Sequence, residues 1–418
     1  MLLLENAIDI LFNELESSLL LPGNVETVPL WEAGGRVLAR EVVATEDVPA
    51  FDRSPIDGFA LIASDTLEAT IDHPVSMKII DTVAAGSYSK KILVPGTTMK
   101  IFTGAPLPQG ANCLVKKEEV TETASEAEGS KSENDSTVII KRKIFSGECI
   151  APKGEDISNG EPLFASGTVL TCAHMGVLAT LGIDPVPVYK KPQIGIFSTG
   201  NELVDVHSQL QHGQLRASNI YTLAEIIRQA GGVPVSLGIV KDRIEDVIQV
   251  YEKAYRLRLP IVISTGGTAS GAYDVIKEAM DMISVSRLFN KVAIRPGAPV
   301  VASVKDGQLL IGLSGNPAGS AVAMLLVMFP VISKLAGTNR HLEQSQAKLS
   351  TDVHRKGGLR GFLWGTYYEQ HGCLYTTPFN NQFCGAIKTH AYSNCLIEIA
   401  AGKVNSATGD LVNIWKLP

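Results

Sequence analysis

Apolar side chains recur every three or four residues at the start of the chain, from Leu4 to Leu19. This spacing places them on one face of a helix, and Pro22-Gly23 supplies a stop signal. The opposite face is acidic, with Glu5 and Asp9 among its residues. We therefore predict an amphipathic N-terminal helix that packs against protein or dimerises, in preference to one that lies on a membrane surface.

Residues 25–187 are rich in short Val, Ile, Gly and Pro runs separated by turn signals, which predicts β-rich structure. Val75–Ile80, Thr98–Thr103 and Thr137–Lys141 are examples of the expected strands. Residues 121–137 are polar, acidic and rich in serine. Because such a segment cannot bury a core, we expect a mobile loop at the tip of a long hairpin.

From Gln193 onward, short apolar runs alternate with helical patterns, which is typical of a parallel, doubly wound α/β sheet. The expected strands are Ile194–Phe197, Val233–Val240, Pro260–Ser264, Val300–Val304 and Leu309–Leu313. The expected helices are Asn219–Gln229, Ile244–Leu257, Asp274–Met282 and a long apolar helix after Pro317. After Gly337 the alternation stops, and short strands with glycine and aromatic residues indicate a small β domain that extends to the C-terminus.

The composition is that of an ordinary globular protein with about two to four domains, since 45% of its 418 residues are hydrophobic and 19% are charged. The formal net charge of −6 argues against nonspecific nucleic-acid binding. None of the six cysteines forms a C-x-x-C pair, so we expect free thiols in a reducing compartment. The longest apolar run, Ala321–Ile332, is too short to span a bilayer, and the N-terminus lacks a secretory signal pattern. A cytoplasmic protein that does not enter a membrane is expected.

Three predicted strands run directly into glycine-rich loops. Phe197 leads into STGNE, Ile263 into STGGTASG, and Leu313 into SGNPAG. Ligands of open α/β sheets bind at the carboxyl ends of strands, where backbone N–H groups at helix N-termini stabilise anions. The three loops therefore predict a cradle for a phosphorylated ligand. None has the G-K-[ST] ending of a Walker A loop or a clean G-x-G-x-x-G, which disfavours ATPase and Rossmann dehydrogenase functions.

Acidic residues accompany these loops and two other glycine-containing turns. Glu202 and Asp274 follow the first two loops, while Asp57 and Asp156 lie in SPIDG and GEDI. Carboxylates near phosphates usually hold Mg²⁺, although each of these residues taken singly also fits a turn, a cap or a surface position.

Three basic residues are candidate partners for an oxyanion. They are Lys291, Arg295 and Arg360, each of which taken alone also fits a solvated surface charge.

The ordered motifs resemble the molybdopterin molybdenumtransferases, the MoeA family that includes the E domain of gephyrin. Any one motif is modestly specific, but their joint order along nearly the whole chain is highly specific. The motifs are SPIDGFAL (54–61), TGAPLPQGAN (103–112), PKGEDI (152–157), STGNELV (198–204), SNIYTL (218–223), STGGTASGAYD (264–274), RPGAPV (295–300), GLSGNPAGSAV (312–322), LRGFLWG (359–365) and SNCLIEI (393–399).

The resemblance implies a multidomain α/β plus β fold. Domain I, residues 1–50 and 149–187, is discontinuous and includes the N-terminal helix, and domain II, residues 51–148, is a β-rich insertion. Domain III, residues 188–336, is the doubly wound α/β domain, similar to the molybdopterin adenylyltransferases. Domain IV, residues 337–418, is a C-terminal β-barrel. Family members form elongated homodimers whose active cleft lies between domain III of one subunit and domains I and II of the other.

The implied reaction converts adenylylated molybdopterin and molybdate to molybdenum cofactor and AMP, with Mg²⁺. The dithiolene that binds the metal belongs to the pterin, so no protein cysteine is required. A molybdopterin adenylyltransferase and the enzymes that accept the cofactor are the implied partners besides the second subunit.

Site residues carry over from the family motifs position by position. The implied catalytic acids are Asp57, Asp156, Glu202 and Asp274. The implied metal ligands are Asp57, Glu202, Asp242 and Asp274. The implied substrate-binding residues are Thr103, Thr199, Gly200, Asn219, Gly266, Gly267, Lys291, Arg295, Pro296, Gly315, Asn316, Pro317 and Arg360.

Four substitutions depart from the family pattern. Ala217 replaces an Asp, Arg243 a second acid after Asp242, Ala298 a Lys of P-G-K-P, and Ser314 a Pro. These changes leave open a paralogue specialised for tungstate, or a molybdopterin-binding paralogue without turnover, including a scaffold. An unrelated Mg²⁺-dependent phosphotransferase fits the loops alone but not the ordered motifs.

Overall fold

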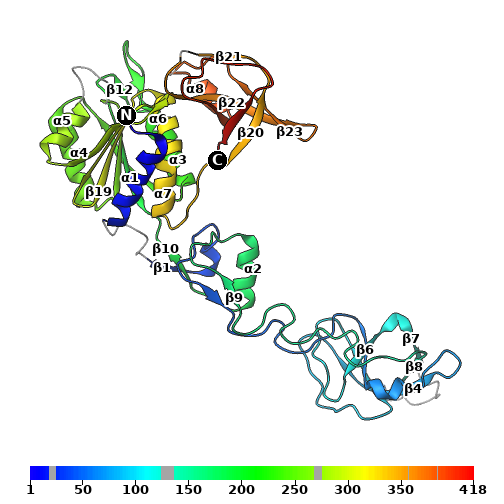
Figure 1. The fold of residues 1–418 in the computed structure, drawn as a ribbon. Helices are drawn as coiled ribbons and strands as arrows, with labels where there is room; N and C mark the ends of the chain where they lie inside the picture. The colour runs from blue at the N-terminus through cyan, green and yellow to red at the C-terminus, as the bar shows by residue number, and fades with distance from the viewer. Residues whose placement is uncertain (18–24, 124–135, 268–274, 356, 384) are drawn as a thin grey trace. The chain divides into compact units, whose positions relative to one another are not determined.

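The computed structural model describes residues 1–17, 25–123, 136–267, 275–355, 357–383 and 385–418 (Figure 1). The chain divides into two compact units. Unit 1 contains Met1–Ala39, Gly167–Leu170 and Pro185–Pro418, and unit 2 contains Arg40–Ser166 and Thr171–Asp184. The four domain boundaries expected from the sequence stay a prediction.

A six-stranded sheet forms the centre of unit 1. In sheet order its strands are β14 (Val233–Val240), β11 (Gln193–Thr199), β15 (Ile261–Thr265), β19 (Gln308–Leu313), β18 (Pro299–Lys305) and β16 (Ser286–Lys291). The first four run parallel, as the alternation of strands and helices predicts. The sheet is mixed rather than wholly parallel, because β18 runs antiparallel to both β19 and β16.

A two-residue turn explains the antiparallel strand. Asp306 and Gly307 join β18 to β19, and both have positive φ, at 48° and 79°. Positive φ at both central positions is the requirement of a tight hairpin turn, for which Asp-Gly is a preferred sequence. This signal was present in the sequence, but the interpretation as alternating strands and helices overlooked it.

Helices cover both faces of this sheet. They are α1 (Leu4–Ser17), α3 (Ser218–Gln229), α4 (Ile244–Arg256), α5 (Val275–Met282), α6 (Pro317–Ala323) and α7 (Phe329–Leu335). The strands alternate strictly: Ile261 and Ile263 of β15 face the core with α1, α3, α6 and α7, while Val262 faces the core with α4 and α5. The N-terminal helix is confirmed, although its predicted end at Pro22-Gly23 lies outside the described residues.

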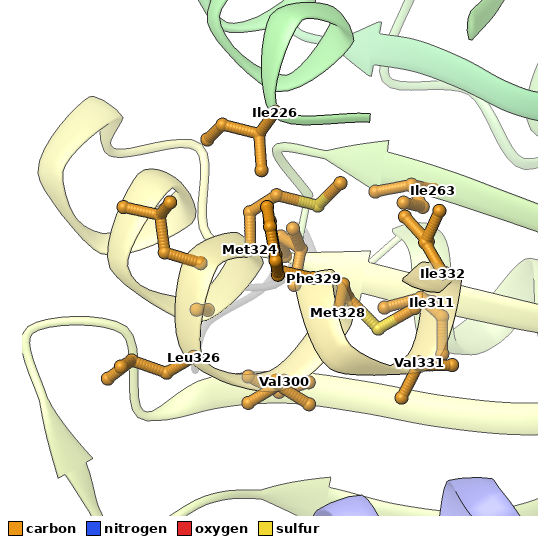
Figure 2. Close-up of a cluster of buried hydrophobic side chains, with 14 of the residues drawn as sticks. Ile226, Ile263, Val300, Ile311, Met324, Leu326, Met328, Phe329, Val331 and Ile332 are labelled. Carbon is orange, nitrogen blue, oxygen red and sulfur yellow. The ribbon is translucent and has the colours of Figure 1, made fainter. Parts of the chain in front are cut away.

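A continuous helical segment, Pro317–Leu335, starts at one of the predicted loops and runs through the core. Met324–Met328 forms a π-helical turn between α6 and α7. It contains Leu326, the residue four positions before Pro330 whose carbonyl a proline ring would meet in a regular α-helix. The segment is long and apolar enough to cross a membrane, but 94% of it is buried inside the protein. Its methionines pack among Ile263, Ile311 and Ile332 (Figure 2), so it serves as a core helix.

The C-terminal part of unit 1 is a closed five-stranded barrel, as the family resemblance implies; the residue pattern alone predicted a small β domain. Around the barrel the strands are β22 (Arg360–Gln370), β23 (Cys373–Pro378), β20 (Gln344–Leu349), β26 (Leu411–Lys416) and β24 (Cys395–Ile399), which pairs again with β22. The short strand β17 (Ile294–Arg295) pairs with β22 and ties the barrel to the central sheet. Smaller elements of unit 1 are α8 (Ile387–Tyr392), the pair β21 (Val353–His354) and β25 (Asn405–Ser406), the pair β12 (Leu203–Val204) and β13 (Leu215–Arg216), the pair β1 (Val25–Val28) and β10 (Val186–Tyr189), and a 3₁₀ turn at Leu30–Glu32.

Unit 2 is β-rich, as expected. Its six-stranded sheet has the order β6 (Cys113–Lys116), β3 (Gly58–Leu61), β5 (Thr97–Ile101), β4 (Val75–Val83), β8 (Thr137–Ile140) and β7 (Val120–Thr123). Its smaller elements are β2 (Val42–Val43), β9 (Pro162–Phe164), α2 (Cys172–Thr180) and the 3₁₀ turns Ala63–Thr66 and Lys117–Glu119. Strands β7 and β8 pair antiparallel with Thr123 opposite Thr137. This agrees with the predicted hairpin, whose tip at 124–135 lies outside the described residues.

A histidine in the barrel region gives the fold a pH-dependent element. The ring of His390 stacks on Trp364 with centroids 4.1 Å apart, and its buried Nε2 has no hydrogen-bond partner. Burial lowers the pKa of His390 to about 4 from an ordinary 6.5. The unfolded chain therefore takes up this proton first, and the contribution to stability is complete above pH 6.5 and is lost as the pH falls toward 4.

Replacing His390 with Phe should make unfolding less dependent on pH in that window, because the stacked ring stays but the protonation site is gone. We expect the loss of stability between pH 7 and pH 5 to shrink by on the order of 1 kcal/mol after allowance for solvent screening. Urea denaturation of both proteins at the two pH values measures this. Parallel losses in the two proteins would show that His390 does not titrate in this window.

Candidate functional site

The structure brings the three predicted loops together around one cavity of about 620 Å³. The loops leave the carboxyl ends of β11, β15 and β19, which are adjacent and parallel. The cavity is lined by Ser198, Thr199, Gly200, Glu202, Leu203, Leu215, Arg216, Ala217, Ser218, Asn219, Asp242, Thr265, Gly266, Gly267, Pro299, Ser314, Gly315, Asn316 and Pro317. We call this the loop cavity; ten of the predicted site residues line it.

The loops approach one another so closely that glycine is required. Gly266 has φ +101°, and a Cβ atom there would lie 2.1 Å from the carbonyl oxygen of Thr199. A Cβ on Gly315 would lie 3.1 Å from the Cα of Gly266. Three backbones are thus packed side by side without intervening side chains, which is the arrangement that exposes peptide N–H groups to a ligand.

A small hydrogen-bond network fixes the positions of the second and third loops. Asn219, in the first turn of α3, donates from Nδ2 to Thr265 Oγ1 and to the carbonyl of Gly315, both at 2.9 Å. Thr265 in turn donates from Oγ1 to the carbonyl of Ser314 at 2.9 Å. Thr265 is 1% exposed, so its hydroxyl lies in the protein interior, whereas the bond from Asn219 to Gly315 is exposed; together the three bonds connect the loops.

Two acids line the cavity near the first loop. Asp242 accepts hydrogen bonds from Thr199 Oγ1 at 2.6 Å and from the Asn201 backbone at 3.2 Å. The carboxylate of Glu202 folds back over Gly200, where a Cβ atom would lie 2.8 Å from its oxygens. Asp274, the third predicted acid of unit 1, lies outside the described residues. Among the residues the structure describes, no group of three or more potential metal ligands occurs.

Two buried polar atoms in the cavity lining have no partner. Ser198 Oγ, on a residue 1% exposed, and Asn316 Oδ1 make no hydrogen bond within the described structure. Buried polar groups are normally paired, so an unpaired atom at a cavity wall indicates a place for a ligand group. Asn316 precedes α6, whose first residue is Pro317, and that helix start points its N–H groups at the cavity edge.

A second cavity, of about 570 Å³, lies beside the first and shares Pro299, Ser314 and Asn316 with it. We call it the arginine cavity, because its lining includes Arg295 and Arg355 and no acidic residue. Pro296 and the substituted position Ala298 also line it.

Backbone pairing places the two arginines together. Arg295 in β17 pairs with Gly361 in β22, and a Cβ on Gly361 would lie 1.7 Å from Nη1 of Arg355. Burial and then the like charge of Arg295 lower the pKa of Arg355. Repulsion of this kind is relieved by an anion, so the cavity suits one. Arg355 was missed in the sequence because it precedes the recognised LRGFLWG motif and only the β17–β22 pairing shows its place.

Two other predicted cations lie elsewhere. Arg360 donates to Glu398 Oε1 at 2.7 Å and pairs with Glu5 at 2.5 Å, so two carboxylates already balance its charge. It lines a groove beside α1 rather than either cavity. Lys291 is exposed at the end of β16 and lines neither cavity. The anion-binding role that the sequence suggested for Lys291 and Arg360 stays a prediction.

The remaining predicted acids belong to unit 2. Asp57 accepts hydrogen bonds from the Thr103 backbone at 3.0 Å and hydroxyl at 2.9 Å, and Lys117 Nζ lies 3.3 Å away. The two bonds from Thr103, followed by Lys117, hold the pKa of Asp57 below its ordinary value. The carboxylate is therefore charged at neutral pH. Asp156 is exposed, and its backbone N–H bonds to the carbonyl of Val48.

Known proteins are similar to this chain along nearly its whole length. Residues 3–182 match the MoeA N-terminal region (domain I and II), 195–334 a probable molybdopterin-binding domain, and 346–417 the MoeA C-terminal region (domain IV). A molybdopterin molybdenumtransferase of Bacillus subtilis is 33% identical over 94% of this chain and 90% of its own. A Staphylococcus aureus protein of the same name is 32% identical over 93% and 90%. The crystal structure of a molybdopterin biosynthesis MoeA protein from Pyrococcus horikoshii covers 100% of this chain and 99% of its own with a TM-score of 0.84 and 27% identity.

An α/β domain with a cradle of strand-end loops, joined to a small barrel and a β-rich unit, defines a multidomain enzyme of molybdopterin metabolism. The chain belongs to the MoeA family of molybdopterin molybdenumtransferases. The family resemblance stated from the motifs is thereby confirmed, as is the fold class.

The substituted position Ala217 precedes α3 and supplies no side-chain cap to it. Ala217→Asp should stabilise the protein by about 1 kcal/mol, because a carboxylate there accepts a hydrogen bond from an unpaired N–H of the first helical turn. Urea denaturation measures the gain, and Ala217→Asn separates capping from charge. Destabilisation by both variants would mean that the buried methyl group of Ala217 contributes more through packing than a cap does.

Proposed function

We propose that this chain inserts molybdate into adenylylated molybdopterin, with Mg²⁺-dependent release of AMP. The observation that carries the proposal is the loop cavity, where three glycine-containing strand-end loops meet beside two carboxylates in a chain of the MoeA family. Gly267 and Gly315 would contact the phosphate groups through their backbones, and Asn219 would keep two of the loops in register. The enzyme then acts by orienting the substrate rather than through a nucleophile of its own.

The cavity residues fit Mg²⁺ bound together with a substrate. Magnesium is usually held by one or two carboxylates plus substrate phosphates rather than by a cage of protein ligands. Glu202 and Asp242 supply two such carboxylates at the same edge of the cavity, and Asp274 stays a predicted third. When bound there, the ion would neutralise charge on the phosphoanhydride. Thr199 and Asn201 orient Asp242 by their hydrogen bonds to it.

The arginine cavity supports the binding of molybdate, which is a tetrahedral dianion. Arg295 and Arg355 supply two positive charges, and the shared wall of Ser314 and Asn316 would put the anion next to a pterin in the loop cavity. Among the described residues, which leave out Cys384, no cysteine lines either cavity. This fits a reaction in which the pterin itself provides the sulfur ligands.

The rest of the proposed setting follows from the family. We expect a cytoplasmic homodimer that receives its substrate from a molybdopterin adenylyltransferase and passes the product to cofactor-accepting enzymes. Tungstate has the same shape and charge as molybdate, so a tungstate-specific paralogue uses the same residues. A paralogue that binds without turnover is less well supported, because the cavity keeps Glu202, Asp242 and Asn219 in mutual contact with its loops.

Reconstitution tests the function directly. Purified protein is mixed with adenylylated molybdopterin, Mg²⁺ and either molybdate or tungstate, and AMP release and incorporated metal are measured over time. We expect both products from the unchanged protein and at least a hundredfold slower release from Asp57→Ala, since positioned charged groups contribute about that much. Tight substrate binding without AMP release under either anion would contradict the proposal and favour the binding-only paralogue.

The oxyanion assignment predicts different effects at two neighbouring arginines. Arg355→Met should raise the KM for molybdate about tenfold or more, because a hydrogen bond to a charged group is worth about 1.5–3 kcal/mol. Arg355→Lys should recover part of the loss. The matched control is Arg360→Met, whose guanidinium is already paired with Glu5 and Glu398. An effect of Arg360→Met on KM larger than that of Arg355→Met would return the anion site to the residue that the sequence suggested.

A further inference from the structure

A strap of fourteen residues, 203–216, forms one wall of the loop cavity. It begins directly after the first loop and ends at the start of α3. Its ends pair as the parallel strands β12 and β13, with Leu203 opposite Leu215 and Val204 opposite Arg216. Three of these four residues, Leu203, Leu215 and Arg216, line the cavity.

The strap makes its wall of the cavity apolar. Leu215 lines the cavity yet is 60% exposed, and Leu203 beside it is half-buried. The facing loops are polar and glycine-rich. A leucine side chain left in water at the mouth of a cavity loses a favourable burial that a flat apolar ligand surface would restore.

Hydrogen bonds within the strap fix its shape. The guanidinium of Arg216 donates from Nε to the carbonyl of Val206 at 2.9 Å and from Nη2 to the carbonyl of Ser208 at 3.0 Å. Leu215 N–H bonds to the carbonyl of Glu202 at 2.9 Å. The planar fork of arginine suits two carbonyls at once, so the apolar surface is preorganised.

The same cavity also contains groups that would bind polar atoms of a ligand. Ser198 Oγ is buried in the lining and has no hydrogen-bond partner among the described residues, and the strand-end loops favour an anion. A ligand that fits the loops, the strap and Ser198 carries an anionic group, a flat face and polar atoms along the edge of that face. A nucleotide or pterin phosphate has this combination.

We propose that Leu215, supported by Leu203, is the contact surface for a flat heteroaromatic ring of the substrate, and that Arg216 is the positioning residue that holds this surface in place. The inference rests on the proposed function, in which the substrate carries a pterin ring and an adenine ring. Either ring has the required chemistry, and the test distinguishes them.

Three probes separate ring contacts from anion contacts. Molybdopterin carries the pterin, AMP carries the adenine, and inorganic pyrophosphate carries no ring. Calorimetric titration of Leu215→Ala should show about tenfold weaker binding of one ring-bearing probe, with pyrophosphate unchanged. The affected probe identifies the ring. Leu210→Ala is the matched control, because Leu210 is an exposed leucine of the same strap, 43% accessible, that does not line the cavity.

The test of Arg216 needs a measurement that would not change if Arg216 only stabilised the fold. Arg216→Met should weaken the same ring-bearing probe as Leu215→Ala and raise the substrate KM with little change in kcat. Arg216→Lys should fail to restore binding, because an ammonium group cannot reproduce the two-carbonyl fork.

Three outcomes would overturn the proposal. They are unchanged binding of both ring probes by Leu215→Ala, equal weakening of all three probes, and an equal effect of Leu210→Ala. The proposed function can fail separately. If ring binding depends on Leu215 but the reconstitution releases no AMP, the proposed activity is rejected and the ring contact is retained.

Discussion

The loop cavity depends on one constraint, the direct approach of three backbones at the carboxyl ends of adjacent strands. Gly266 sits so near the carbonyl of Thr199 that no side chain fits between them. Gly315 approaches Gly266 from the third strand. Because the strands are parallel and in register, their loops end at the same level, and the peptide groups rather than side chains form the cradle. The remaining side chains of the cavity serve to hold or to charge this cradle.

The core explains why the cradle is rigid enough to bind a ligand. The helical segment that starts at Pro317 is buried over almost all of its length and packs on the same sheet face as α1 and α3. Asn219 begins α3 at the other side and bonds to the loops from both neighbouring strands. Moving one loop would therefore disturb a buried helix, a buried threonine and two strand ends together, so burial converts a glycine-rich segment into a fixed surface.

Periodicity in the sequence was sufficient for five strands of the central sheet and the helices that cover it, because alternation and helical spacing report directly which face is buried; it missed the edge strand β16. The prediction of a wholly parallel sheet was wrong at β18, because the tight turn at Asp306-Gly307 makes β18 antiparallel to β19. The different surroundings of Arg360 and Arg355 could not have been predicted. Both are basic residues near one motif, and only the tertiary structure places Glu5 and Glu398 beside Arg360 and backbone carbonyls of Ile399 and Leu359 beside Arg355.

The substitutions acquire a meaning once the two cavities are considered together. The family aspartate absent at Ala217 would have added a negative charge to the loop cavity, and the lysine absent at Ala298 would have added a positive charge to the arginine cavity. The loop cavity has two acids, Glu202 and Asp242, beside one base, Arg216, and the arginine cavity has two bases, Arg295 and Arg355. The expected difference in electrostatic potential between the two cavities is smaller than it would be with the family residues at 217 and 298, but its sign is the same. Under the proposed function we therefore expect a cation and an oxyanion to prefer different sides of the wall that the two cavities share, a separation that metal insertion would require.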